Sequence, residues 1–345
     1  MSVTYGKRSE KSVKLPAIIW LLLGTGISEF QGPSRLARSI QDAKAELLVY
    51  SSNGNDVGLL TKGSVEPLKL DTLLSIPGGC CLHPATPSLS PEGGRIAYVH
   101  LSSTQPRREG INIYDHDGHK EKEVFQANLI WAVSWAPDGQ RVAAIADTTG
   151  EPGHNLYVVD LTSNATSRLS HGALNLGGKQ YILSNHAAPS WNGAGNQLAV
   201  EVQSASSPAE NSASRAIIVW DIQTNEVHRV ADGTDPAWSQ AKDVIAFFEP
   251  SRQRCFTVRP DGSERTLLFT LGRKGFTSKL SLLSFPVVWS PDGNQLIFHQ
   301  WVDADLITNV YRLDLRSGKP RFLGRSEVQV VDWRQGIKSG SGSSR

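Results

Sequence analysis

The sequence predicts an all-β protein in which one sheet-forming unit is repeated around a ring. A Trp-Ser/Ala-Pro-Asp-Gly motif recurs with variations, and short β-branched or aromatic runs follow each copy. Proline and glycine recur too often for helices of useful length. The copies are spaced 44 to 56 residues apart, which matches one four-stranded blade per repeat. The predicted fold is therefore a six-bladed β-propeller of four-stranded blades.

Five copies of the motif are present in the chain. They occupy Ser88–Val99, Val133–Ile145, Trp191–Val200, Trp238–Phe247 and Val288–Phe298, and the third and fourth copies are the most divergent. In Pro-Asp-Gly, proline presets φ, the aspartate side chain bonds its own turn, and glycine can adopt positive φ. We therefore expect a tight hairpin turn at each copy, with a strand on either side.

The two ends of the chain complete the sixth unit. Val328–Trp333 has the pattern of a first strand alone, and Glu46–Tyr50, Val57–Leu60 and Val65–Leu70 have the pattern of second, third and fourth strands. We expect Val328–Trp333 to pair with Glu46–Tyr50, because closure removes the exposed edges that an open array would leave. Both termini of the propeller then lie in one blade.

One position of the repeat carries a large apolar side chain in all six units, the five copies of the motif and the unit formed by the two ends of the chain. Its occupants are Leu89, Trp135, Trp191, Trp238, Trp289 and Trp333. We expect these side chains to pack between blades, because each would remove about 150 to 250 Å² from water at about 25 cal/mol per Å².

The motif resembles the repeat of TolB-like, PD40 propellers, in which Trp-Ser-Pro-Asp-Gly precedes a Leu-Ala-Phe-like strand. The resemblance extends from about Glu46 to Trp333. Val219-Trp220-Asp221 is also similar to the Trp-Asp pair of WD40 repeats, but the Gly-His partner of that repeat is missing. TolB itself carries an additional N-terminal domain, for which the stretch before Glu46 is too short. The resemblance implies the fold and leaves the function open, because propellers host many roles.

The segments that flank the predicted propeller, residues 46–335, have other compositions. Residues 1–31 combine a basic stretch with an apolar run, Leu15–Ile27, which is typical of a signal sequence or a membrane anchor. No A-x-A-like cleavage site follows it, so an uncleaved anchor is the alternative. We expect residues 32–45 to form a linker and residues 336–345 a disordered tail. The expected location is periplasmic or otherwise extracytoplasmic.

Composition argues against nucleic-acid binding. The formal net charge is only +2, and part of the positive excess lies in the two flanking segments. Arg252, Arg254, Arg259 and Arg265 form the only dense basic patch, which we interpret as a solvated face. The three cysteines, Cys80, Cys81 and Cys255, have no metal-ligand spacing, and buried free thiols are favoured over a disulfide.

In a propeller, the loops after the second and fourth strands gather on the face opposite the Pro-Asp-Gly turns. We call this the loop face, and the opposite one the turn face. Functional residues concentrate on loops that a rigid scaffold holds. The expected partner-binding residues are therefore His83, Asp147, His154, His186, Asp232, Asp235, Glu249, Arg252, Asp303 and Asp305.

Two functions remain open on the sequence. The first is a monomeric, non-catalytic scaffold that binds a protein or peptide partner without a cofactor or metal. The second is a propeller enzyme, a saccharide lyase or hydrolase, with His and carboxylate side chains at the central channel. Serine peptidase relatives are excluded because no Gly-x-Ser-x-Gly elbow occurs. The first is favoured, since no short-range ligand or catalytic spacing joins the histidines.

Overall fold

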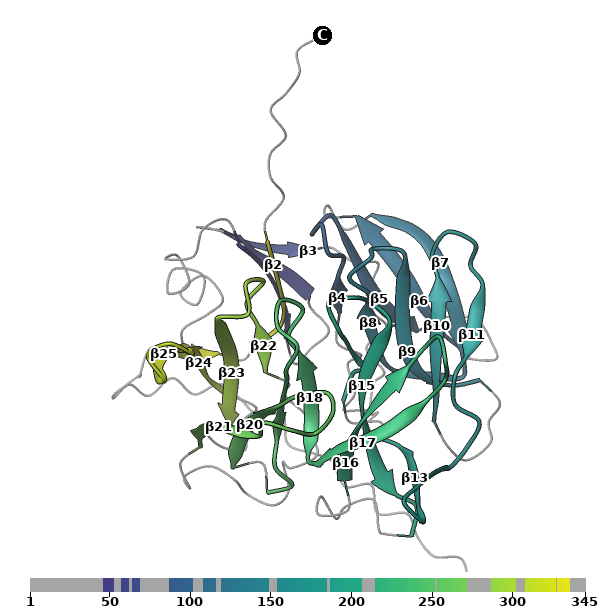
Figure 1. Cartoon of the computed structure of the whole chain (residues 1–345). Coiled ribbons are helices and arrows are strands. Elements are labelled where there is room, and N and C mark those ends of the chain that lie inside the picture. The colour runs from purple at the N-terminus through teal and green to yellow at the C-terminus, as the bar shows by residue number, and fades with distance from the viewer. Residues whose placement is uncertain are drawn as a thin grey trace, which may run out of the picture. The chain divides into compact units, whose positions relative to one another are not determined.

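The computed structural model describes residues 46–52, 57–61, 64–68, 87–101, 108–115, 119–148, 154–184, 187–206, 215–251, 253–271, 287–301, 308–326 and 328–335. In these ranges, every regular element is a β-strand. The strands form six antiparallel sheets, of which five are four-stranded (Figure 1). This confirms an all-β propeller with four-stranded blades.

The sheets are numbered here in the order of the repeats. Sheet 1 contains β4 (Ser88–Leu89), β5 (Arg95–Leu101), β6 (Glu109–Asp115) and β7 (Lys120–Ala127). Sheet 2 contains β8 (Leu129–Trp135), β9 (Arg141–Asp147), β10 (Asn155–Asp160) and β11 (Thr166–Arg168). Sheet 4 contains β18 (Thr234–Trp238), β19 (Ile245–Phe248), β20 (Arg254–Val258) and β21 (Thr266–Thr270). Sheet 5 contains β22 (Val288–Trp289), β23 (Gln295–Trp301), β24 (Thr308–Asp314) and β25 (Lys319–Ser326).

Sheet 6 joins the two ends of the chain, as the repeat count predicts. It contains β26 (Val328–Gln335), β1 (Glu46–Ser52), β2 (Val57–Thr61) and β3 (Ser64–Leu68) in that order. β26 pairs with β1 along its length, with Trp333 opposite Leu48 and Val328 opposite Ser52. In Figure 1 the yellow C-terminal strand lies beside the purple N-terminal strands.

Sheet 3 departs from the four-stranded plan. It contains β12 (Leu174–Leu176), β13 (Lys179–Leu183), β14 (Ser190–Trp191), β15 (Gln197–Ser204), β16 (Arg215–Asp221) and β17 (Val227–Asp232). β13 and β14 pair with the same edge of β15, at different points along it. The β12–β13 hairpin is therefore an addition to the repeat, and it turns on Gly177 and Gly178, whose φ values are 59° and 77°.

The Pro-Asp-Gly positions form the predicted turns. Gly93, Gly139, Gly195 and Gly293 have φ values of 76°, 72°, 69° and 66°, which only glycine adopts without strain. Each of these glycines donates its N–H to the carbonyl three residues earlier, at N···O distances of 2.9 to 3.1 Å. The third copy, which lacks proline and aspartate, makes the same turn because Gly195 retains the required glycine.

The innermost strands form a closed ring. β4 contacts β8, β8 contacts β14, and the succession continues through β18, β22 and β26 back to β4. Apolar side chains fill the space between neighbouring sheets, and one such cluster packs Val99 and Ile113 of sheet 1 against Trp135 and Val142 of sheet 2. Because each sheet buries both faces against its neighbours, its strands have nearly continuous apolar runs.

Several sequence predictions lie outside the described residues. They include the targeting segment within residues 1–31, the linker at 32–45 and the tail at 336–345. Cys80 and Cys81 also lie there, whereas Cys255 is a buried free thiol. In the described part of the chain, no helix is long and apolar enough to span a membrane.

Candidate binding site in the central channel

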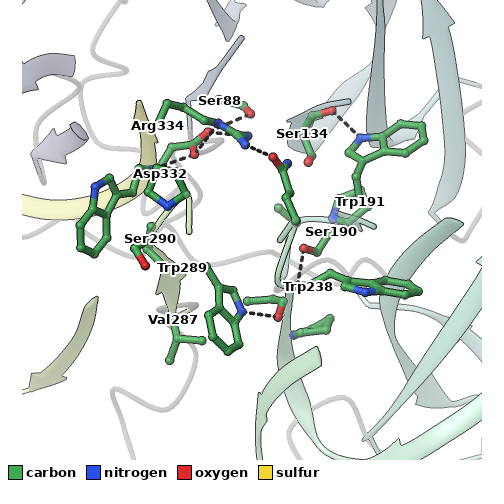
Figure 2. Close-up of a pocket in the computed structure, with 18 of the residues that line it drawn as sticks. Ser88, Ser134, Ser190, Trp191, Trp238, Val287, Trp289, Ser290, Asp332 and Arg334 are labelled. Atoms are coloured by element: carbon green, nitrogen blue, oxygen red, sulfur yellow. Dashed lines mark hydrogen bonds and ion pairs between the residues drawn. The ribbon is translucent and has the colours of Figure 1, made fainter. Parts of the chain in front are cut away.

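A cavity runs along the axis of the ring, and every sheet contributes to its wall. Its volume is about 130 Å³, and its lining residues come from β4, β8, β14, β18, β22 and β26 together with the residues that flank them (Figure 2). The lining is mostly small or aromatic, with serines from sheets 1, 2, 3 and 5. This cavity is the central channel of the propeller.

At three junctions of the ring, the residue before the repeat position connects one sheet to the next. The backbone N–H of Trp135 donates to Ser88 Oγ at 2.9 Å, and that of Trp238 donates to Ser190 Oγ at 2.8 Å. At the junction between sheets 6 and 1, the N–H of Leu89 donates to Asp332 Oδ2 at 3.0 Å. The same repeat position therefore supplies the acceptor at three junctions of the ring, and at the chain's closure point this acceptor is a carboxylate.

Other junctions use the indole group. Trp191 Nε1 donates to the carbonyl of Ser134 at 3.1 Å, and Trp289 Nε1 donates to the carbonyl of Ala237 at 2.8 Å. All six occupants of the repeat position are at most 8% exposed. Arg95 lies over the Trp135 ring and Arg141 over the Trp191 ring, with guanidinium carbon to ring centroid distances of 5.3 and 5.4 Å.

Asp332 and Arg334 are the charged side chains in the described lining of the channel. Arg334 Nε lies 3.1 Å from Asp332 Oδ1, and both side chains are only about one-seventh exposed, at 13% and 14%. Arg334 Nη1 also donates to Gln240 Oε1 at 2.6 Å. Gln240 belongs to the turn of sheet 4, so the Arg334 side chain links sheets 6 and 4, on either side of sheet 5.

A second polar network lies where strands of sheets 3 and 4 end at the loop face. The Glu201 carboxylate is fully buried and forms an ion pair with Arg215, with a distance of 3.2 Å between Oε1 and Nη1. It also accepts hydrogen bonds from Ser184 Oγ at 2.7 Å and from the Asp235 N–H at 2.9 Å. Breaking such a buried pair on one side costs about 3 to 5 kcal/mol. The network therefore fixes the ends of β13, β15, β16 and β18 relative to one another.

The structure distributes the predicted partner-binding residues over different environments. Asp235 is 2% exposed, has a φ of 58° and belongs to the buried network, so it is part of the scaffold of the loop face. Asp232 is exposed and forms an ion pair with Arg229. Asp147 and His154 are partly exposed on sheet 2. His83, His186, Arg252, Asp303 and Asp305 lie outside the described residues.

Glu249 is held in an ion pair on sheet 4. Arg254 donates to it through Nε at 2.8 Å and Nη2 at 2.5 Å, and Ser251 Oγ donates at 2.7 Å. The hydrogen bond from Arg254 is the main reason that the pKa of the Glu249 carboxyl lies below its usual range. The Glu249 carboxylate is therefore an anion whose hydrogen-bond partners, Arg254 and Ser251, lie in the same β19–β20 hairpin.

The described histidines do not converge. His299 is buried in β23, and desolvation lowers its pKa to about 4. His154 packs edge-on against Trp131, with ring centroids 5.0 Å apart. Among the described residues, no three His, Cys, Asp or Glu side chains are arranged to hold a metal ion.

The sequence prediction missed Asp332, Arg334 and Gln240. A signal for Asp332 was available, because it occupies the position before the repeat tryptophan at which Ser88, Ser134 and Ser190 occur. Gln240 and Arg334 gave no comparable signal, because their contact depends on how sheets 4 and 6 face each other across the ring.

No family model matches the chain. Solved structures are similar at low sequence identity. TolB from Acinetobacter baumannii has 15% identity and a TM-score of 0.56, covering 84% of this chain and 66% of that chain. A chain of a nidogen/laminin complex has 10% identity and a TM-score of 0.52, covering 84% and 97%. An oligogalacturonate lyase in complex with manganese has 13% identity and a TM-score of 0.49, covering 82% and 74%. The chain therefore has the fold of a TolB-like β-propeller.

Proposed function

We propose that this protein is a non-catalytic, six-bladed propeller that binds a protein or peptide partner through its loop face. The six-stranded sheet 3 counts as the sixth blade, because β14, β15, β16 and β17 occupy the four places that strands fill in the other sheets. The protein acts as a monomer without a cofactor. The proposed site comprises the loops that the network of Glu201 and Arg215 supports.

The observation that carries this proposal is the set of contacts made by the two charged side chains in the described lining of the channel, Asp332 and Arg334. Asp332 accepts from Leu89 N–H and pairs with Arg334, and Arg334 also donates to Gln240. A general acid or base needs a position from which it reaches a reacting group. In the described channel these side chains instead connect one sheet to another, which supports a structural role for the channel and a binding role for the loops.

The proposed location is outside the cytoplasmic membrane, with residues 15–27 serving as a signal or an uncleaved anchor. The support is the apolar run with its preceding basic residues, Lys7, Arg8, Lys11 and Lys14. Expression of the full chain with a C-terminal epitope, followed by fractionation and protease treatment of cells with a permeabilised outer layer, tests this location. Retention in the cytosolic fraction would contradict it.

Site-specific photo-crosslinking tests the binding proposal. A photoreactive phenylalanine analogue at Ser206, an exposed residue that follows β15 on the loop face, is expected to give a discrete adduct in the native host. The same analogue at Thr224, which is exposed in the β16–β17 turn on the turn face, is the matched control. Equal adducts at both positions, or none at any loop-face position, would refute the proposal.

The enzyme hypothesis has a direct test of its own. Purified protein incubated with oligogalacturonate is expected to leave it uncleaved, so that no unsaturated uronate product absorbs in the ultraviolet. Turnover that is retained on repurification and lost on removal of divalent metal would overturn the non-catalytic proposal.

A further inference from the structure

The β24–β25 hairpin of sheet 5 has the same turn as two other hairpins of the ring. In each, an aspartate at the end of the third strand accepts the backbone N–H groups of the residues two and three positions later, at 2.7 to 3.1 Å. The residue four positions after the aspartate has a φ of 57° to 63°. The three aspartates are Asp160, Asp221 and Asp314. Because the turns share one backbone, positions counted from the aspartate can be compared directly.

The side chains on this shared backbone differ in charge. Residues 312–322 of sheet 5 include four basic residues and one acidic residue, and the basic ones are Arg312, Arg316, Lys319 and Arg321. The corresponding places in sheets 2 and 3 hold no lysine or arginine. They are occupied by Val158, Thr162, Ala165 and Ser167 in sheet 2 and by Val219, Gln223, Glu226 and His228 in sheet 3. The turn itself therefore does not require the basic residues of sheet 5.

Three of these cations are available to a partner. Arg316 and Lys319 are exposed and Arg312 is partly exposed, and none of the three forms an ion pair with a carboxylate that the structure describes. Asp314, the single carboxylate of the hairpin, accepts two backbone N–H groups of the turn. Arg312 and Arg321 are register partners. Register partners of like charge destabilise an antiparallel pair, so the two arginines do not serve the pairing of β24 with β25.

An exposed aromatic side chain lies beside these cations. Phe322 follows Arg321 on β25, the outermost strand of the sheet, and is 50% exposed. Its ring packs edge-on against Tyr311, with 5.5 Å between centroids, and this contact restrains its orientation. An aromatic ring among lysines and arginines is typical of protein surfaces at the membrane interface, where the ring enters the headgroup region and the cations meet anionic headgroups.

The segment that the sequence predicted to be the dense basic patch has a different charge balance. Its three described arginines face four carboxylates, which are Glu249, Asp243, Asp261 and Glu264. This balance agrees with the interpretation of that segment as a solvated face. The sequence prediction overlooked residues 312–322, where four cations accompany one carboxylate.

Protection of the sheet edge does not account for the charges of sheet 5. Lysine and proline on an outermost strand hinder the addition of a further strand, and Lys319 with Pro320 can serve this purpose on β25. Arg312, however, is on β24, which is paired on both sides, and Arg316 is in the turn. Neither arginine is on the free edge, so edge protection leaves both unexplained.

The course of the chain favours a membrane as the partner of this hairpin. The apolar run Leu15–Ile27, proposed above as a signal or an uncleaved anchor, is followed by residues 28–45 and then by β1 of sheet 6. Residues 28–45 can span at most about 60 Å. β22 of sheet 5 contacts β26 of sheet 6, so sheet 5 is next to the sheet that the chain enters from its N-terminal segment. An anchor in the bilayer would therefore keep the hairpin within reach of the lipid surface.

We propose that the β24–β25 hairpin docks on an anionic lipid surface, with Arg312, Arg316 and Lys319 against the lipid phosphates and Phe322 in the headgroup region. The inference rests on the membrane location proposed above and adds which side of the propeller meets the bilayer. Because the contact is on the outer edge of sheet 5, it leaves both the loop face and the turn face uncovered. A partner on the loop face and a lipid surface at sheet 5 can therefore be bound together.

A fluorescent label on the hairpin measures this contact. The protein is the full chain with Cys80→Ser and Cys81→Ser, in which Cys255 is buried. The environment-sensitive fluorophore NBD is attached at Ser317→Cys, and at Thr224→Cys in the equivalent turn of sheet 3 as the matched control. Vesicles of phosphatidylcholine mixed with phosphatidylglycerol are expected to shift the emission of the Ser317 label to the blue and to leave the Thr224 label unchanged. Because the label reports its own surroundings, insertion of the apolar run elsewhere does not produce this shift.

Charge removal makes the test quantitative. Arg316→Gln with Lys319→Gln is expected to raise the lipid concentration at half-maximal shift roughly tenfold to thirtyfold, because each basic residue near an anionic surface contributes about fivefold to binding. Arg108→Gln with Lys179→Gln removes two exposed cations of sheets 1 and 3 and changes the net charge equally, so it is the control and is expected to have little effect. Phe322→Ser is expected to weaken binding even at high salt, since burial of the ring is not screened.

Four results would overturn the inference. The first is no shift of the Ser317 label with the mixed vesicles, and the second is an equal shift of both labels. The third is an equal loss of affinity in the two double variants. The fourth is a response of the Ser317 label to a single-stranded oligonucleotide without a response to vesicles, which would assign the hairpin to a soluble polyanion. Retention of the chain in the cytosolic fraction, or a lack of loop-face crosslinks, would leave the vesicle result unchanged, so failure of the proposed function and failure of this inference are distinguishable.

Discussion

Replacing Asp332 by alanine is expected to weaken the point at which the ring closes. Its carboxylate accepts the backbone N–H of Leu89 at 3.0 Å and lies 3.4 Å from Ser88 Oγ, so it joins β26 at the end of the chain to β4 near its start. It also pairs with Arg334, whose side chain is 13% exposed. One substitution thus removes two interactions across the junction between sheets 6 and 1 and one ion pair within β26.

The expected loss in free energy of unfolding comes from the groups that have no partner in the Asp332→Ala variant. Leu89 is fully buried, and its N–H would lose its acceptor while Arg334 loses its carboxylate. An unsatisfied buried donor costs about 1 to 3 kcal/mol, and a hydrogen bond to a charged group is worth about 1.5 to 3 kcal/mol, so we expect a loss of about 2 to 4 kcal/mol. Ser190→Ala removes a neutral acceptor at the equivalent position of sheet 3 and is expected to cost about 1 kcal/mol.

Urea unfolding monitored by tryptophan fluorescence measures both losses, with Asp332→Asn as the variant that keeps an acceptor and loses the charge. Wild type is expected to be the most stable and Asp332→Ala the least stable. Ser190→Ala and Asp332→Asn are expected to lie between them, at similar stability. Hydrogen exchange should rise in β26, β1 and β4 and stay unchanged in sheet 3. An Asp332→Ala protein within about 0.5 kcal/mol of wild type, or faster exchange spread evenly over all sheets, would refute the reasoning.

Three further predictions concern other parts of the ring. Burial lowers the pKa of His299 to about 4, so the unfolded chain binds the proton first. Stability should therefore fall as pH drops from about 6.5 to about 4, by up to roughly 3 kcal/mol, and His299→Gln should flatten that region of the urea-unfolding pH profile. A Cβ at Gly193 would clash with the Gln240 carbonyl oxygen, so Gly193→Ala should lower the melting temperature, whereas Gly94→Ala, which has room, should not. Burial raises the pKa of the Cys255 thiol, so in a variant without the other two cysteines Ellman's reagent should react only after unfolding; rapid reaction with native protein would contradict this.

The turns could be predicted because their causes are local. Pro-Asp-Gly at Pro137–Gly139 and at Pro291–Gly293 sets the backbone within a few residues, and the structure has positive φ at both glycines. The added hairpin of sheet 3 was missed, although Gly177-Gly178 between Leu174–Leu176 and Lys179–Leu183 is a hairpin signal. The regular repeat has no strand pair before the innermost strand, so the repeat pattern argued against a hairpin at this point in the chain.

The candidate site was much less predictable than the fold. The sequence prediction placed partner-binding residues on the loop face, and Asp235 proved to be buried in the network of Glu201 and Arg215. Loop position alone does not separate a side chain that faces solvent from one that is buried, as Asp235 is, with its backbone N–H donating to the Glu201 carboxylate. Only the packing of sheet 3 against sheet 4 makes that distinction.

The sequence by itself determined the repeat, the turn chemistry and the closure of the ring, because each depends on residues close in the chain or on counting strands at its two ends. The tertiary structure alone decided which side chains meet in the channel. Leu89 and Asp332 are 243 positions apart, and Gln240 and Arg334 are 94 apart. Such pairs depend on the angle and register at which separate sheets face one another, and those are set by the packing of all the sheets together.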